Sequence, residues 1–207
     1  MFVDIHTHID NQSVIKIVSE NFEEKTFHTV GVHPWDVDDY EKEVPRNLWS
    51  LGMTAIAIGE VGLDKAHKET FDRQIEVFEE MIKISENLRK PVIVHCVRAY
   101  SEIIEMRKKT KATMPWVIHG FNSSVETIRQ LLKYDIYISL GEVLYRNENQ
   151  AIKILKDIPV ERLFLETDVS GRDIKNVYAK AASLMGCEMD FLCNKIFENY
   201  GRLETAH

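Results

Sequence analysis

Six residues with metal-binding side chains stand at or directly after the ends of apolar stretches in this chain. The first two are His6 and His8, which follow the mostly apolar stretch 2–5 and are separated by one residue. Residues two apart on a strand point to the same face, so the two imidazoles would share one direction. The other four come later in the chain: Glu60, His95, His119 and Asp168. Histidine and carboxylate donors together form a common ligand set for zinc, manganese, iron and nickel.

Each of these residues also has an ordinary structural alternative. A histidine after an apolar strand is more often a hydrogen-bonded core or rim residue than a metal ligand. Glu60 alone could be a carboxylate at a helix N-terminus, and Asp168 alone could cap the helix that follows it. Six such residues at the ends of five strands favour one shared metal site over six separate structural roles.

Apolar stretches alternate along the chain with segments whose apolar residues have helical spacing. The strands and helices that these patterns predict must bring the six residues together. The apolar patterns predict strands at residues 2–8, 13–18, 28–33, 54–59, 91–94, 116–118, 135–140 and 162–167. Helical spacing of apolar residues predicts helices at 69–89, 101–109, 125–132, 148–156, 174–185 and 189–198. This alternation is typical of parallel strands joined by right-handed crossovers.

The predicted fold class is α/β, a compact (β/α)₈ TIM-type barrel formed by residues 1–207 as a single domain. Residues 19–26 are polar and too few for a crossover helix, so the crossover between strands 2 and 3 is predicted to be shortened. In such a barrel the carboxyl ends of the strands open on one rim, which carries the active site. The six residues would therefore converge on one cavity, and their number predicts two divalent ions bridged by Glu60.

Composition narrows the classes of protein that fit. No apolar run approaches the ~20 residues that a membrane span needs, and the N-terminus shows no secretory pattern, so we expect no membrane association. Three cysteines (Cys96, Cys187 and Cys193) are an odd number without metal-finger spacing, which favours reduced thiols and a cytoplasmic location. The net charge of −7 disfavours broad non-specific binding to nucleic acid, but bound cations can reverse the local potential. We expect no stable protein partner.

Six short motifs occur in a characteristic order along almost the whole chain. They are D-x-H-x-H at 4–8, G-x-H-P at 31–34, G-E-x-G-L-D at 59–64, P-V-x-x-H at 91–95, H-x-F at 119–121 and E-T-D at 166–168. Together they resemble the pattern of the TatD-type metal-dependent hydrolases of the amidohydrolase-like superfamily. The resemblance implies a (β/α)-barrel, a mono- or binuclear metal centre and hydrolysis, with DNA exonuclease activity in some relatives. It also places the family's metal ligands on the six residues already identified.

The chain departs from this family pattern near the substrate rather than at the metal ligands. Val97 and Arg98 stand where the family has arginine and aspartate, and Trp35 replaces the last histidine of G-x-H-P-H. The loop after E-T-D is short, and only Arg172 and Asn176 resemble the family's R-G-x-x-N spacing. The predicted anion contacts are His33, Arg98 and Arg172.

These observations lead to one main hypothesis and two alternatives. The main one is hydrolysis of a phosphodiester by a metal-activated water, as in a deoxyribonuclease-like enzyme, with 3′-end exonuclease action as one form. Asp168 and Glu60 are the predicted catalytic carboxylates, and zinc is the first of the candidate ions, before manganese, magnesium, iron and nickel. The expected substrate is a small phosphodiester or a nucleic-acid end. The alternatives are an amide, lactone or ester hydrolase with the same metal centre, and a catalytically inactive metal-binding barrel.

Overall fold

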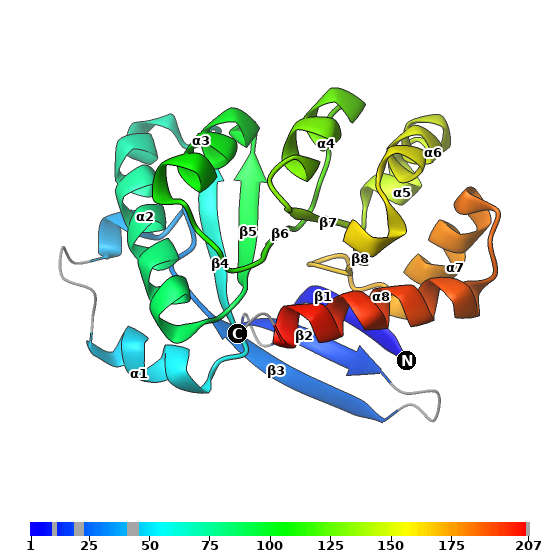
Figure 1. The fold of residues 1–207 in the computed structure, drawn as a ribbon, viewed down its shortest axis with the longest axis horizontal. Coiled ribbons are helices and arrows are strands. Elements are labelled where there is room, and N and C mark those ends of the chain that lie inside the picture. The colour runs from blue at the N-terminus through cyan, green and yellow to red at the C-terminus, as the bar shows by residue number, and fades with distance from the viewer. Residues whose placement is uncertain (10–11, 19–22, 41–45, 206–207) are drawn as a thin grey trace.

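The computed structural model describes residues 1–9, 12–18, 23–40 and 46–205 of the chain. Within them one sheet curves into a nearly closed barrel, with its strands in chain order (Figure 1). A single bridge between Thr7 and Asp168 joins the first strand to the segment after the last. The strands are β1 (Phe2–Ile9), β2 (Gln12–Val18), β3 (Glu24–Val30), β4 (Ala57–Asp64), β5 (Val92–Val97), β6 (Trp116–Ile118), β7 (Tyr137–Leu140) and β8 (Leu163–Leu165). The predicted fold class, an eight-stranded α/β barrel, is confirmed.

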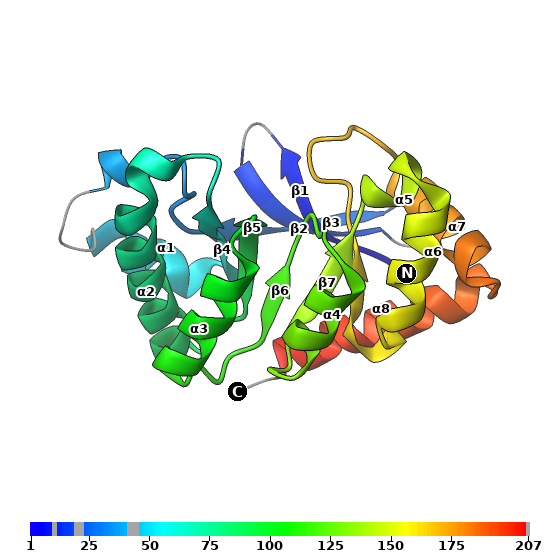
Figure 2. The ribbon, with the colours of Figure 1, turned by 90° about the horizontal axis from the view of Figure 1, so that it is seen from above.

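Helices pack against the outside of the parallel part of the barrel, as the view from above shows (Figure 2). Their apolar residues recur at helical spacing, so each helix turns one stripe toward the sheet. In α2 that stripe includes Val77, Phe78 and Met81, all buried. The helices are α1 (Arg46–Thr54), α2 (Phe71–Leu88), α3 (Tyr100–Thr110), α4 (Val125–Leu132), α5 (Val143–Arg146), α6 (Glu148–Asp157), α7 (Ile174–Met185) and α8 (Met189–Glu204), with short 3₁₀ turns at Val37–Asp39, Lys68–Thr70 and Val160–Arg162.

The second strand runs against the rest of the sheet. β2 pairs antiparallel with both β1 and β3, whereas the later strands pair in parallel. The expectation of parallel strands throughout was therefore wrong for β2. Only residues 10–11 separate β1 from β2, and residues 19–23 separate β2 from β3, while a parallel crossover needs about a dozen residues. The predicted short connection between strands 2 and 3 is confirmed. Because it is too short for a crossover, β2 and β3 form an antiparallel hairpin.

The fourth strand begins and ends later than its apolar pattern predicts. Helix α1 continues through Thr54, and β4 runs from Ala57 to Asp64, with Glu60 in its middle rather than after its end. The pairing of β4 with β5 shifts register between Ile58 and Val61, and such a bulge redirects a side chain locally. At Gly62, where φ is +146°, a Cβ would lie 2.0 Å from the backbone oxygen of His95. Glycine at this position therefore permits the close approach of β5 to β4.

Helix α4 has the bounds that the sequence pattern predicts, whereas α8 is longer than predicted. The N-cap of α4 is Ser124, whose hydroxyl accepts a hydrogen bond from the backbone N–H of Thr127 at 3.2 Å. Helix α8 continues through Gly201 to Glu204.

The two ends of the chain are tied together in the core. The hydroxyl of Tyr178, in α7, donates to the backbone oxygen of Val3 at 3.0 Å and accepts from its N–H at 3.1 Å. This contact fixes α7 against β1, the strand that carries His6 and His8. Across the described residues, the helices are all too short or too polar to cross a membrane.

Candidate metal centre

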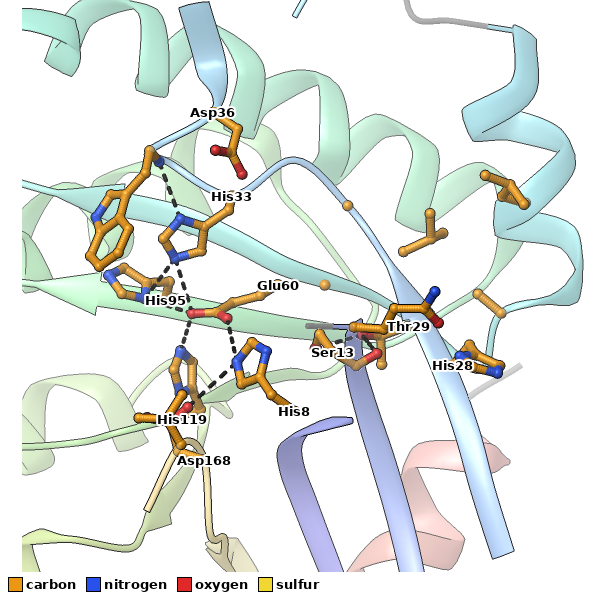
Figure 3. A pocket seen from close by; sticks show the side chains of 18 of the residues that line it. His8, Ser13, His28, Thr29, His33, Asp36, Glu60, His95, His119 and Asp168 are labelled. Carbon is orange, nitrogen blue, oxygen red and sulfur yellow. Dashed lines mark hydrogen bonds and ion pairs between the residues drawn. The ribbon is translucent and has the colours of Figure 1, made fainter. Parts of the chain in front are cut away.

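Glu60 stands at the centre of the predicted metal-binding residues (Figure 3). One carboxylate oxygen, Oε1, lies 2.6 Å from His95 Nδ1 and 2.7 Å from His119 Nε2. The other, Oε2, lies 3.3 Å from His6 Nε2 and 3.5 Å from His8 Nε2. The bulge in β4 and the carboxyl ends of β1, β5 and β6 bring these side chains to one place. The four histidines thus share a single carboxylate between two pairs.

Asp168, which follows the last strand β8 and lies beside β1, completes the group. Its Oδ1 lies 3.6 Å from His6 Nε2 and 3.5 Å from His8 Nε2. Its backbone N–H donates to the backbone oxygen of His6 at 3.0 Å. The neighbouring Thr167 donates to the carboxylate of Asp4 from its backbone at 2.9 Å and from its hydroxyl at 2.6 Å. These contacts hold the D-x-H-x-H and E-T-D motifs side by side, so the structure brings all six predicted ligands together.

The donor atoms fit a divalent cation. Three sets of side chains have ligand atoms within 4.8 Å of one another: His6, His8 and Glu60; His6, His119 and Asp168; His33, Glu60 and His95. Within the described residues, the buried Nε2 of His6 lies at ion-pair distance from two carboxylates and makes no hydrogen bond with either. A buried donor atom aimed at two carboxylates without a hydrogen bond is suited to a metal ligand.

Electrostatics in the cluster favour positive charge. Burial alone would raise the pKa of Glu60, but the surrounding histidines, His119 foremost, hold it far below its usual value. Burial alone would lower the pKa of His6, but the carboxylates of Asp168 and Glu60 outweigh it and raise that pKa to about 10. The pKa of Asp168 is lowered, because contact with His6 outweighs the effect of burial. Two ionised carboxylates in a buried place form the negative field that a divalent ion requires.

His6 has an outer partner that the sequence did not reveal. Its Nδ1 lies 3.3 Å from the hydroxyl of Ser13, which in turn accepts a hydrogen bond from the hydroxyl of Thr29 at 2.8 Å. Ser13 lies on β2, where it pairs with His8 across the hairpin. The sequence did contain one indication of this contact. Only residues 10–11 separate the two strands, and so short a connection requires a hairpin in which β2 runs back along β1. A partner on Nδ1 fixes the orientation of the ring and directs Nε2 toward the carboxylates.

Replacing Ser13 with alanine is expected to weaken metal binding about tenfold, because an outer-shell hydrogen bond to a ligating histidine is typically worth ~10–100-fold in affinity. Competition with a chromogenic chelator measures the change. Ser13→Thr retains the hydroxyl and should bind metal within about twofold of the original chain. Equal affinity in Ser13→Ala would show that Ser13 does not orient His6.

His33, predicted as an anion contact, lies within the cluster. Its Nε2 is 3.3 Å from Glu60 Oε1 and 3.4 Å from His95 Nδ1. The backbone N–H of Trp35 donates to its Nδ1 at 3.2 Å. Because Nδ1 accepts this bond, the neutral ring carries its hydrogen on Nε2. His33 is therefore arranged to donate a hydrogen bond from Nε2, which suits an anion contact better than a metal ligand.

The two predicted arginine contacts lie apart from His33. His33 lines a cavity of about 980 Å³, Arg98 a second of about 800 Å³, and Arg172 a third of about 340 Å³. All three cavities reach Asp168. The guanidinium of Arg172 is already engaged, 3.3 Å from a carboxylate oxygen of Glu142 and 4.0 Å from the ring centre of Tyr145. Arg98 is exposed, and none of the hydrogen bonds or ion pairs of the described residues involves it.

Cys96 is unsuited to act as a nucleophile. Its thiol is buried, and burial raises its pKa to about 12.

Glu166 is buried next to His119, and its surroundings favour the neutral, protonated form of its carboxyl group. Burial raises the pKa of its carboxyl to about 8, and its Oε1 accepts a hydrogen bond from the backbone N–H of Gly120. The same oxygen lies 3.9 Å from His119 Nδ1. The protonated form is therefore favoured in the folded protein up to a higher pH than in the unfolded chain.

In the presence of EDTA, Glu166→Gln is expected to gain stability over the original chain as pH rises from about 4.5 to 8. The folded-state pKa is raised, so the contribution of Glu166 is fully present below its unfolded pKa and is lost as pH rises through the folded value. The neutral amide does not titrate, and the difference should reach roughly 4 kcal/mol by pH 8. Urea unfolding at several pH values measures it. A difference that is constant with pH would contradict the raised pKa.

Comparison with known proteins gives a consistent result. A family model described as "TatD related DNase" matches residues 1–204. The Escherichia coli protein named "Uncharacterized metal-dependent hydrolase YcfH" is 33% identical over 190 residues, covering 84% of this chain and 71% of that protein. Human "3'-5' RNA nuclease TATDN2" is 33% identical over 155 residues, covering 70% of this chain and 20% of that protein. The chain spans 58–71% of the length of the first bacterial hydrolases that it matches.

A solved structure has the same fold. The crystal structure of YJJV, a TatD homologue from Escherichia coli, superimposes with a TM-score of 0.74 at 20% identity, covering 86% of this chain and 76% of that one. This chain therefore shares its overall fold with a solved structure.

Proposed function

This chain belongs to the TatD-related DNase family and is a metal-dependent hydrolase, and from that premise we propose that it hydrolyses a phosphodiester in a small molecule or at the end of a short nucleic acid. The cluster around Glu60, in which five histidines lie within 3.5 Å of one carboxylate, is the observation that carries the proposal. The names of the family and of the human relative support a phosphodiester as the bond.

We propose that the cluster holds two divalent ions that share Glu60. Zinc is the first candidate, and manganese, magnesium, iron and nickel are the others, because the donors are imidazoles and carboxylates. When bound, such ions lower the pKa of a coordinated water toward ~7 and stabilise negative charge on the attacked oxygen. The proposed ligands of one ion are His6, His8 and Asp168, and those of the other are His95 and His119.

The chain's own residues have distinct roles in this proposal. The carboxylate of Asp168 accepts the proton of the attacking water, since its side chain is 36% exposed to the cavities and its lowered pKa keeps it ionised at neutral pH. His33 donates a hydrogen bond from Nε2 to a phosphoryl oxygen. Arg98 is free to contact a neighbouring phosphate from the second cavity, while Arg172 must first leave Glu142 and Tyr145.

Removal of metal tests the function directly. The purified protein should hydrolyse a chromogenic phosphodiester and a short single-stranded oligonucleotide, lose both activities in EDTA, and regain them with added zinc or manganese. A long duplex should be bound weakly even at low salt, because the net charge is −7 and few phosphate contacts are available. Tight, salt-sensitive binding and fast degradation of duplex DNA would contradict the preference for small substrates.

The same experiment decides between the alternatives. A lactone, an amide and a simple ester are included in the panel, and metal-dependent turnover of one of these alone would replace the phosphodiester. Bound metal with no turnover of any substrate would indicate an inactive metal-binding barrel.

Two further proposals concern the chain as a whole. We propose that residues 1–207 act as one domain, since the buried apolar residues of the described part form one continuous cluster. We also propose a cytoplasmic location, supported by three cysteines that form no disulfide within the described residues, of which Cys96 and Cys193 are buried.

A further inference from the structure

Trp35 is an exposed aromatic ring beside the candidate metal centre. The side chain is 59% exposed, although large apolar side chains are usually buried. It lines the cavity of about 980 Å³ that also contains His33, Glu60 and His95. The other walls of this cavity include Val30, Leu51 and Ala55, so an apolar surface extends from the metal-binding side chains.

The exposed ring is nevertheless held in one orientation. Its indole Nε1–H donates to Asp64 Oδ2 at 2.8 Å, and the other oxygen of that buried carboxylate accepts from the backbone N–H of Ala66 at 2.8 Å. The ring centre lies 4.9 Å from that of His33 at 87° and 5.2 Å from that of His67 at 40°. The polar group of the indole is thus satisfied, and the ring is supported without being covered.

A fixed, exposed aromatic surface next to a reaction centre is suited to stacking. Binding to a ring that is already oriented costs little ordering on the protein side. Stacking of a base on an aromatic side chain tolerates any base, because every base has a π-face. An apolar cavity wall with an aromatic surface would offer little to a phosphodiester that carries only small alkyl groups.

We propose that Trp35 is a specificity-determining residue that stacks on the nucleobase of the nucleotide whose phosphate reaches the candidate metal centre. The inference rests on the proposed function and narrows its substrate to phosphodiesters that carry a base.

Binding of product-like ligands tests this inference without requiring turnover. The zinc-loaded protein is titrated calorimetrically with adenosine monophosphate and with ribose 5-phosphate, which has the same phosphate and sugar and lacks the base. We expect adenosine monophosphate to bind about tenfold or more tightly than ribose 5-phosphate, since a base–aromatic stack is worth roughly 5- to 150-fold. In Trp35→Ala the two affinities should become equal, through weaker binding of adenosine monophosphate.

A positioning role for Trp35 predicts a different outcome. Asp64 Oδ2 lies 3.4 Å from His95 Nε2, so loss of the indole N–H could disturb His95. Trp35→Phe removes this hydrogen bond and retains a ring, and should therefore preserve most of the preference for the base. Trp49→Ala is the matched control, because Trp49 is an exposed tryptophan that does not line the cavity.

The outcomes separate the inference from the proposed function. Equal binding of both ligands to the original protein, or an equal loss for both in Trp35→Ala, overturns the stacking role. A base preference that depends on Trp35 supports it even if no phosphodiester is hydrolysed, and in that case only the proposed reaction fails.

Discussion

Asp168→Asn is expected to reduce turnover by about 10³-fold at saturating metal, because the amide cannot accept the proton that a positioned general base removes. Several features should keep the fold intact. The side chain is partly exposed, and the contact of the backbone N–H with the oxygen of His6 does not involve the carboxylate. The backbone of Asp168 has a φ of 48°, a conformation that asparagine adopts as readily as aspartate.

Steady-state turnover of the chromogenic phosphodiester, measured with a thermal melt of the same sample, checks this expectation. Asp38→Asn is the matched control, since Asp38 is exposed and lines none of the three cavities that reach Asp168. The control should retain full turnover, and the melting temperature of Asp168→Asn should stay within a few degrees of the original. Unchanged turnover in Asp168→Asn would remove Asp168 from the reaction.

The location of the site could be predicted from the sequence because it depends on strand ends alone. His95 and His119 each lie at the end of an apolar stretch, and parallel strands bring such ends to one rim whatever their exact pairing. Glu60 was placed at the same rim by a strand boundary that was wrong. The bulge between Ile58 and Val61 directs it into the cluster from within β4, and a register shift of this kind has no periodic signal in the sequence.

Contacts between distant side chains could not be predicted in this way. The sequence pattern identifies Arg172 as a cation, but its pairing with Glu142 and its position over Tyr145 depend on how α5 and the loop after β8 meet. Ser13 reaches His6 because β2 turns back along β1, which the expectation of parallel strands excluded. Such contacts require the tertiary arrangement, whereas the position of the candidate metal ligands at one rim follows from the order of the strands.

Glu60→Gln is expected to have the largest effect on metal content, because one carboxylate contacts all four histidines that are proposed as metal ligands. The amide removes the negative charge and places a hydrogen-bond donor on one side of the group. Both proposed ions should therefore bind more weakly, by more than the ~10–100-fold typical of losing an outer-shell partner. Turnover should fall at least as far as in Asp168→Asn.

Comparison with His95→Ala tests whether Glu60 is a ligand of both ions, because His95 is proposed as a ligand of one ion alone. His95 lies near one oxygen of Glu60, while His6 and His8 lie near the other. His95→Ala should therefore lower the occupancy of one ion first, whereas Glu60→Gln should lower both together. Elemental analysis after dialysis against a graded series of zinc concentrations measures the two occupancies, with Glu105→Gln as an exposed control. Loss of one ion in Glu60→Gln, with the other bound at its original affinity, would show that Glu60 does not contact both ions. A carboxylate shared by two ions loses its charge toward both when it is replaced by an amide.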